Sequence, residues 1–495
     1  MSKAIKGMLT LLMAVVVLGF GAFTYLDLYG GKSDTSVQTE SGVTLQFWYT
    51  DSSMTSYYNN AASYFNKRNA GITIVPTLVD SAEYLDDIYE ASVEGVSYPD
   101  LYVISDDSLG KAYLAGLTVP VTGDDLDTLW EEFSTVSISA VTYENKVLGY
   151  PLYFNTSTLV YNETYLRQIA SGETASSEDE DDVDLSTADS EDESGASMEN
   201  TADTEEDVDA ESGADEAAGA EEVSEESAPQ DTTAEDSSVS IEDLVPVTVG
   251  ELLDLANNYE APDGVESLFK WDVNDVFYNY YFIGGQIVVD GSTSSDVDIN
   301  TEGAINCLTI FQELTEFFYV DPDEVDADSI LEEFLEGKVL FTIMDINHAL
   351  QLEEAAAEGT MEYDYGYSVI PHPSDVWMGA ALSVTQVVVV NGYSEYADAA
   401  AAFAAFLTGE YGREVENLYT STGHVSANKT VEKTTELEEV FSKEYERSTC
   451  LPKNPAAGNF WMLLENTFSS VWEGESIEAQ LLALEDQVKA QYAAE

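Results

Sequence analysis

The sequence predicts an α/β protein in which helices cover both faces of a mainly parallel sheet. This prediction rests on a regular alternation of elements, because apolar strands are expected at 43–48, 71–75 and 101–104 with an amphipathic helix after each of the first two. In sheets of this kind, ligands bind beyond the carboxyl ends of the strands. The segments 49–53 and 105–108 follow two such ends, so a ligand is expected there.

The elements of this first unit follow from apolar periodicity. Residues 43–48 alternate as a strand does, and Tyr58, Ala61 and Phe65 fall on one face of the helix that follows. Ser81 is expected to be the N-cap of the second helix, because a serine hydroxyl can accept a hydrogen bond from an unpaired helical N–H group.

The alternation continues to the end of the chain. A strand is expected at 337–343, after a helix that contains Phe334. Residues 386–390 form a continuous β-branched run, which is typical of a strand buried on both faces. Helices are expected at 301–319 and 397–407, and the last helix carries an apolar stripe made of Ile477, Leu481, Leu484 and Val488.

The N-terminus has the pattern of an export signal. Lys3 and Lys6 precede an apolar run at 8–25, which approaches the length of about 20 residues that a bilayer-spanning helix needs. We expect residues 1–27 to be an uncleaved signal and anchor in the cytoplasmic membrane, followed by a spacer at 28–41, with the rest on the outer face. Secretion after cleavage is the alternative.

The net charge of −78 for 495 residues is unusual, and part of it is local. Residues 171–245 contain 29 Asp and Glu and no Lys or Arg, so the remaining chain carries −49 (−78 plus 29). The negative electrostatic potential of such a chain repels nucleic acid and anionic lipid, so both are poor partners. The stretch 171–245 has too little apolar surface to offset its ordering entropy and is expected to be a disordered insertion. A solvated spacer is favoured over a cation-binding or partner-binding tail.

Nothing in the sequence indicates an enzyme. Nucleotide-binding, zinc-protease and serine-hydrolase motifs are absent, and the three His residues show no metal-ligand spacing, so no cofactor or metal is expected. Carboxylate pairs for a glycan hydrolase carry no information in a chain with 95 acidic residues. Cys307 and Cys450 are expected to be separate buried thiols, although a pairing is left open.

The segment 145–166, NKVLGYPLYFNTSTLVYNETYL, is the most informative stretch of the chain. It resembles the crossover segment of the extracellular solute-binding proteins that serve ABC sugar importers, the family of the maltose-binding protein. Further segments resemble elements of that family in the same order, namely 98–101, 113–117, 247–252, 282–287, 334–339, 370–373 and 422–425. Two depart from the pattern, because Val249 replaces the usual Trp and the last segment lacks its Pro.

The resemblance implies a two-lobed periplasmic-binding-protein type II fold with a ligand cleft and a hinge between the lobes. Lobe 1 would comprise 42–151 and 371–426. Lobe 2 would comprise 152–170, 246–370 and 427–495, with the acidic insertion at 171–245 projecting from it.

The family's cleft positions imply a set of ligand-binding residues. Aromatic faces stack on sugar rings, and polar side chains hydrogen-bond sugar hydroxyls. Trp461 is the preferred stacking residue. Other interpretations are open for some, because Asp51 and Asp107 could cap helices and Asn155 could be a turn residue. The full set is Asp51, Ser52, Ser53, Asp107, Tyr153, Asn155, Trp271, Asp272, Asn274, Tyr278, Asn347 and Trp461.

The function that the resemblance implies is capture of a sugar or oligosaccharide and its delivery to the membrane subunits of an ABC permease, without chemistry. None of the implied ligand-binding residues is cationic, which disfavours a strongly anionic solute. The alternatives are a sensing adaptor of the same fold coupled to a membrane kinase and, third, an extracellular glycan hydrolase.

Overall fold

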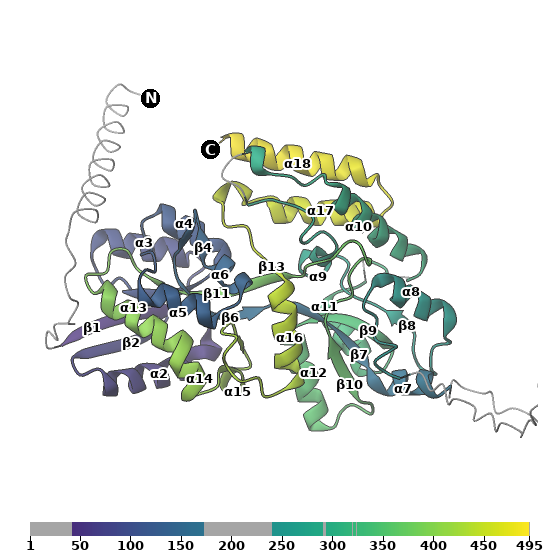
Figure 1. Cartoon of the computed structure of the whole chain (residues 1–495), viewed down its shortest axis with the longest axis horizontal. Coiled ribbons are helices and arrows are strands. Elements are labelled where there is room, and N and C mark those ends of the chain that lie inside the picture. The colour runs from purple at the N-terminus through teal and green to yellow at the C-terminus, as the bar shows by residue number, and fades with distance from the viewer. Residues whose placement is uncertain (1–41, 173–239, 291–293, 319, 323, 495) are drawn as a thin grey trace, which may run out of the picture.

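The computed structural model describes residues 42–172, 240–290, 294–318, 320–322 and 324–494 (Figure 1). The expected anchor at 1–27, the spacer at 28–41 and residues 173–239 of the expected insertion lie outside this part of the chain. Within the described residues, no helix has both the length and the apolar character needed to cross a membrane.

The first sheet has seven strands in the order β12-β6-β11-β3-β1-β2, with β13 paired to β11. β1 is parallel to β2 and β3, as the alternation predicts, but β11 is antiparallel to β3 and β6. The strands are β1 (Val43–Tyr49), β2 (Ile72–Leu78), β3 (Leu101–Ser105), β6 (Tyr150–Asn155), β11 (Leu382–Val390), β12 (Val425–Ser426) and β13 (Thr449–Cys450).

The helix predicted at 397–407 is confirmed as α13, which ends one residue earlier, but the expected N-cap of the second helix is wrong. Ser81 does not cap a helix, because α3 begins at Tyr84 and its N-cap position is Glu83. The Ser81 hydroxyl instead accepts the Glu83 N–H in the turn before the helix, at 3.1 Å. The helices are α2 (Thr55–Arg68), α3 (Tyr84–Glu94), α4 (Leu109–Leu114), α5 (Asp124–Glu132), α6 (Thr135–Ala140), α13 (Ala397–Phe406), α14 (Gly412–Glu414) and α15 (Leu418–Thr422).

The second sheet has four strands in the order β10-β7-β9-β8. β7 is antiparallel to β9 and β10, and β8 is parallel to β9. The strands are β7 (Ser157–Asn162), β8 (Ser267–Phe269), β9 (Val339–Asp345) and β10 (Tyr365–Ser368). The helices around them are α7 (Glu163–Ser171), α8 (Val249–Asn258), α9 (Val276–Asn279), α10 (Glu302–Glu313), α11 (Ala327–Leu335), α12 (Ile346–Glu358), α17 (Phe460–Trp472) and α18 (Ile477–Ala494).

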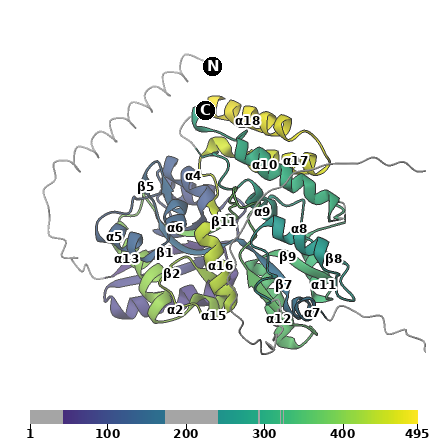
Figure 2. The ribbon, with the colours of Figure 1, turned by 45° about the vertical axis from the view of Figure 1, so that its right-hand side comes forward.

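The two sheets lie in separate bodies that the chain joins more than once (Figure 2). Thr156 alone separates β6 of the first sheet from β7 of the second. Residues 369–381 return from β10 to β11, and α16 (Glu436–Arg447) packs against elements of both bodies. The exact lobe bounds stay a prediction. The first sheet includes β6 as far as Asn155, past the expected division at 151, and it includes β13, past the expected division at 426.

The margins of the expected disordered insertion are ordered. Ser171 is the last residue of α7, and residues 240–245 form hydrogen-bonded turns. Leu244 is 5% exposed and belongs to the core of the second lobe. The prediction of disorder is therefore wrong for 240–245, because Ile241 and Leu244 supply apolar surface that the acidic stretch before them lacks.

The two cysteines are unpaired, as expected. Cys307 is buried in α10, and Cys450 is partly buried in β13.

Candidate functional site

The carboxyl ends of strands from both sheets meet at the Thr156 crossover. β6 runs parallel to β3, because β11 lies antiparallel between them. Ser157, the first residue of β7, pairs with Asp345, the last residue of β9. The ends of β3, β6, β8 and β9 therefore face the region between the sheets, where α/β folds bind ligands.

A groove of about 690 Å³ occupies this region, within the size range of small-molecule sites. The first sheet and its following loop contribute Asp107, Leu382 and Val384 to its lining. The second lobe contributes Asp272, Asn274, Asp275, Val276, Phe277, Val325, Asp326, Leu451, Trp461 and Glu465. The groove thus combines carboxylates and an amide with two aromatic side chains. A second hollow of about 450 Å³ lies at the ends of β1 and β3 and includes Thr50, Ser105, Ser108 and Lys111.

Trp461 lies in the first turn of α17 and is held by neighbouring rings. Its ring centroid is 5.8 Å from that of Tyr280 and 5.0 Å from that of Phe460. Tyr280 and Phe460 are buried, whereas Trp461 is only partly buried and lines the groove. The packing fixes the indole at the wall of the groove.

Asp272 and Asn274 belong to the turn that follows β8. Asp272 Oδ1 accepts the N–H groups of Asn274 and Asp275, at 2.9 and 3.2 Å. Burial raises the pKa of the Asp272 carboxyl, against the effect of these hydrogen bonds. Asn274 Nδ2 donates to the carbonyl of Pro322 at 2.7 Å, so this side chain holds the turn in place.

Asp107 lies across the groove, in the short helix Asp106–Ser108 that follows β3. Its Oδ1 accepts hydrogen bonds from the hydroxyls of Ser105 and Ser108. The N-cap position of α4 is Ser108, so Asp107 does not cap that helix.

Asp51, Ser53 and Tyr153 come together in a second cluster, centred on His424. His424 Nε2 lies 3.0 Å from Asp51 Oδ2, and the Tyr153 hydroxyl donates to the same oxygen at 2.9 Å. The Tyr153 and His424 rings stack with centroids 4.2 Å apart. The hydrogen bond from His424 holds the pKa of Asp51 well below its usual range, against the effect of burial. Asp51 also caps the short helix Ser52–Met54, and Ser52 is exposed.

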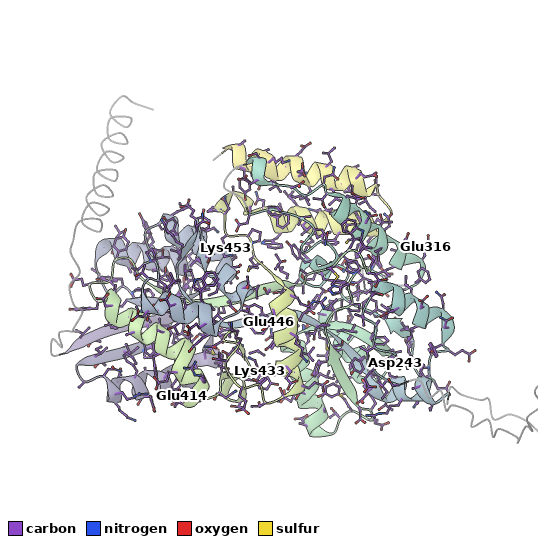
Figure 3. All side chains as sticks on the ribbon, viewed as in Figure 1. Asp243, Glu316, Glu414, Lys433, Glu446 and Lys453 are labelled. Carbon is purple, nitrogen blue, oxygen red and sulfur yellow. The ribbon has the colours of Figure 1, made fainter. Side chains whose placement is uncertain are left out.

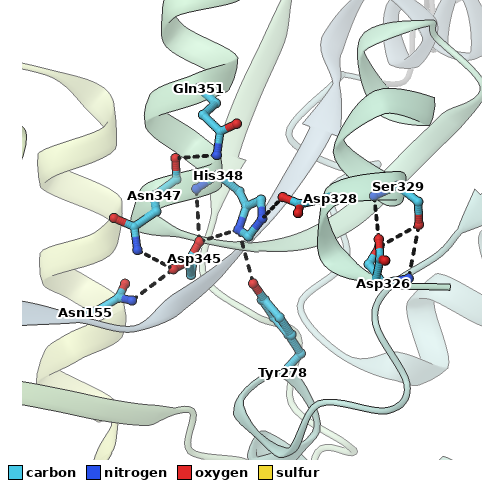
Figure 4. Close-up of polar contacts among 9 residues, drawn as sticks. All are labelled: Asn155, Tyr278, Asp326, Asp328, Ser329, Asp345, Asn347, His348 and Gln351. Atoms are coloured by element: carbon cyan, nitrogen blue, oxygen red, sulfur yellow. Dashed lines mark hydrogen bonds and ion pairs between the residues drawn. The ribbon is translucent and has the colours of Figure 1, made fainter. Parts of the chain in front are cut away.

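Asn155 and Asn347 bind a shared carboxylate at the crossover (Figure 4). Asn155 Nδ2 and Asn347 Nδ2 donate to Asp345 Oδ2, at 2.9 and 3.0 Å. Asn155 Oδ1 accepts the N–H of Ile346 at 3.2 Å. Asn155 therefore ties the end of β6 to the end of β9, across the two sheets.

His348 completes this crossover cluster. Its Nδ1 lies 2.6 Å from Asp345 Oδ1 and 3.3 Å from the hydroxyl of the buried Tyr278, and its Nε2 lies 3.2 Å from Asp328 Oδ1. The hydrogen bond to Asp345 raises the pKa of His348 against the effect of burial. Burial alone would raise the pKa of Asp345, but hydrogen bonds from His348 and Asn155 lower it by more.

These two shifts predict a pH window for the crossover. The raised pKa of His348 gives stability that is present below about pH 6.5 and is lost as pH rises through the folded-state value. The lowered pKa of Asp345 gives stability that is present above about pH 4 and is lost as pH falls through its folded-state value. We expect His348→Gln to lower the free energy of unfolding by about 1 kcal/mol between these limits and by less at a pH above the folded-state pKa of His348. Urea unfolding midpoints of both proteins, measured over a range of pH, give this loss of stability. A loss that does not change with pH would contradict the prediction.

Trp271 is not a groove residue. Its side chain is 0% exposed, and its ring stacks on Phe269 with centroids 4.6 Å apart. Its indole N–H donates to Asn279 Oδ1 at 2.8 Å. The expectation of a ligand contact is wrong for this residue, because a side chain with no accessible surface cannot stack on a sugar.

The structure therefore divides the predicted site residues. Asp107, Asp272, Asn274 and Trp461 line the groove. Asp51, Ser53 and Tyr153 form the His424 cluster, while Asn155, Asn347 and Tyr278 form the crossover cluster. Nine lining residues were not predicted, and the acidic or aromatic ones among them are Asp275, Phe277, Asp326 and Glu465. Asp275 and Phe277 lie next to predicted positions in the sequence and Glu465 lies four residues after Trp461, whereas Asp326 has no such signal. Among the described residues, no group of three or more His, Cys, Asp or Glu is placed to hold a metal ion.

The model of a protein family, bacterial extracellular solute-binding protein, matches residues 60–200 and 225–448. No curated protein matches the chain.

Solved structures with the same fold share little sequence with the chain. One is a cyclo/maltodextrin-binding protein complexed with maltotetraose, at TM-score 0.65 and 18% identity, covering 92% of this chain and 98% of that one. Another is an extracellular solute-binding protein from Staphylococcus aureus in complex with maltose, at TM-score 0.65 and 15% identity, covering 92% and 99%. A third is the maltose-binding periplasmic protein from Listeria monocytogenes in complex with maltose, at TM-score 0.64 and 17% identity, covering 91% and 98%.

Proposed function

The chain belongs to the bacterial extracellular solute-binding proteins, and from this premise we propose that it captures a sugar or oligosaccharide outside the cell and delivers it to an ABC permease. The structures that share its fold include proteins solved with maltose and maltotetraose. The observation that carries the proposal is the groove between the two sheets, in which Trp461 lies among carboxylates and an amide.

The chemistry of the lining suits a sugar. An indole ring offers an apolar face to the C–H side of a pyranose. Asp107, Asp272 and Asn274 present oxygen atoms that can accept hydrogen bonds from hydroxyl groups. Because these groups come from both lobes, a sugar that contacts them all favours the conformation in which the lobes are close together.

Capture would then be a hinge motion with release of the solute unaltered. The short connection at Thr156 and the returning segment 369–381 are the places where backbone rotation would change the angle between the sheets. Ligand binding shifts the equilibrium towards the closed form by the difference in affinity between the two forms. The permease would recognise the closed form.

Binding without turnover can be tested by thermal shift. We expect a saccharide ligand to raise the melting temperature progressively with concentration, corresponding to about 2.7 kcal/mol at a hundredfold excess over Kd. Chromatography after incubation should recover the same saccharide intact. Absence of any shift across maltodextrins, other neutral oligosaccharides and amino sugars would contradict the proposed function, and released shorter sugars would indicate a hydrolase.

The location would be the outer face of the cytoplasmic membrane, with residues 1–27 as the anchor. The proposal rests on the basic residues Lys3 and Lys6 ahead of the apolar run 8–25. Fractionation of cells that produce the full chain tests it, because recovery of the whole chain from the medium would contradict anchoring.

A further inference from the structure

Resting on the function proposed above, we propose that the solute of the groove is a cationic sugar, that is, an amino sugar or an oligosaccharide of amino sugars. The inference concerns the chemical class of the solute and starts from the charge of the groove lining. Five lining residues are acidic, namely Asp107, Asp272, Asp275, Asp326 and Glu465. None of the described residues that line the groove is Lys, Arg or His.

Several of these carboxylates have oxygen atoms available to a ligand. The hydrogen bonds that the Asp107, Asp275 and Asp326 side chains accept from described residues all end on Oδ1, leaving Oδ2 as an acceptor. Glu465, in the second turn of α17, is exposed and has no hydrogen-bond or ion-pair partner among the described residues. Four carboxylates of the groove therefore have unused acceptor atoms.

The nearby cationic side chains do not form ion pairs with the groove carboxylates. Lys270 Nζ lies 2.7 Å from Glu333, and His348 contacts Asp345 and Asp328. Lys453, labelled in Figure 3, is 5% exposed and lies near the buried Asp106, whose pKa burial raises to about 7 in spite of that lysine. Lys111 lines the hollow beside β1 and β3. Among the described residues, none of the five groove carboxylates forms an ion pair.

The unpaired carboxylates of the groove determine the free-energy cost of closing the two lobes over a solute. Closure removes water from several negative charges, and a charge that loses water without a partner is strongly disfavoured. Hydroxyl groups of a neutral sugar can donate hydrogen bonds but bring no charge. An ammonium group donates hydrogen bonds and also carries a positive charge. Its attraction to the carboxylates grows as water leaves the groove. Phe277 and Trp461 add ring faces, which attract cations as well as apolar C–H groups.

The test compares sugars that differ at one substituent. Glucosamine and glucose form one pair, and the β-1,4-linked trimers of glucosamine, N-acetylglucosamine and glucose form a matched set with an ammonium, an acetamido or a hydroxyl group. Titration calorimetry uses the full chain at a pH below the pKa of the sugar amine. At low salt, the amino sugars should bind at least about tenfold more tightly than the matched hydroxyl and acetamido sugars. The preference should shrink as salt screens the charges.

A pair of variants tests the groove itself. Glu465→Gln should weaken binding of the glucosamine trimer about threefold more than it changes binding of cellotriose. Glu473→Gln is the matched control, because Glu473 is an exposed residue at the other end of the same helix. Equal or tighter binding of the hydroxyl or acetamido sugars would overturn this inference while supporting the proposed function. Failure of every saccharide to bind would overturn both.

Discussion

Replacing Trp461 by alanine is expected to remove most of the ligand-dependent rise in melting temperature. The indole is a large aromatic surface in the groove, and its truncation would remove the contact with the apolar face of the sugar. Central aromatic residues of binding sites typically contribute about 2–4 kcal/mol, so we expect an affinity loss of about 30-fold or more. The unliganded protein should lose only about 1 kcal/mol, because Trp461 packs on Tyr280 and Phe460 at the edge of the core.

Trp130→Ala is the matched control for this experiment. Trp130 lies on α5 of the first lobe, is 56% exposed and does not line the groove. Its replacement removes the same side chain and should leave the affinity unchanged. Calorimetric titration of both variants decides the matter. If Trp461→Ala binds as tightly as the unchanged protein, Trp461 is not part of the site and the groove loses its stacking residue.

Local periodicity was sufficient to predict several of the longer elements. The buried faces of α2 and α18 follow apolar residues spaced by three and four, and the valines of β11 read as a strand buried on both faces. The antiparallel direction of β11 could not be read in this way. Strand direction depends on where the chain returns after the second lobe, which no local pattern records.

The groove residues were predicted only in part, because the resemblance to a family supplies sequence positions but not the surroundings of each side chain in the fold. Trp271 and Asp272 are neighbours in sequence, yet one is fully buried and the other reaches the groove. The partners of Asp51 and Asn155 could not be predicted either. His424 lies 373 positions after Asp51 (424 minus 51), and Asp345 lies 190 positions after Asn155. These pairs come close only because the chain passes between the two sheets more than once.

Trp271→Ala is expected to have the opposite effect to Trp461→Ala, with a large loss of stability and little direct effect on the solute. The ring is fully enclosed, stacking on Phe269 and contacting Phe311 and Trp472 edge-on at centroid distances of 6.5 and 5.6 Å. Truncating a buried aromatic residue to alanine costs about 3–5 kcal/mol, since the neighbours cannot fill the cavity. Loss of the indole N–H also leaves the buried Oδ1 of Asn279 without its donor.

The conservative variant separates these two contributions. Trp271→Phe keeps an aromatic ring but removes the N–H group, so it should cost about 1–3 kcal/mol, less than the alanine variant. Urea unfolding followed by the fluorescence of the remaining tryptophans measures both, and calorimetric titration at low temperature measures the affinity of the folded protein. We expect the affinity to stay within about threefold, because the Asp272 turn is held by its own hydrogen bonds to Asn274 and Asp275. An unchanged unfolding midpoint together with lost binding would show that Trp271 reaches the solute after all, in a conformation where the second lobe is packed differently.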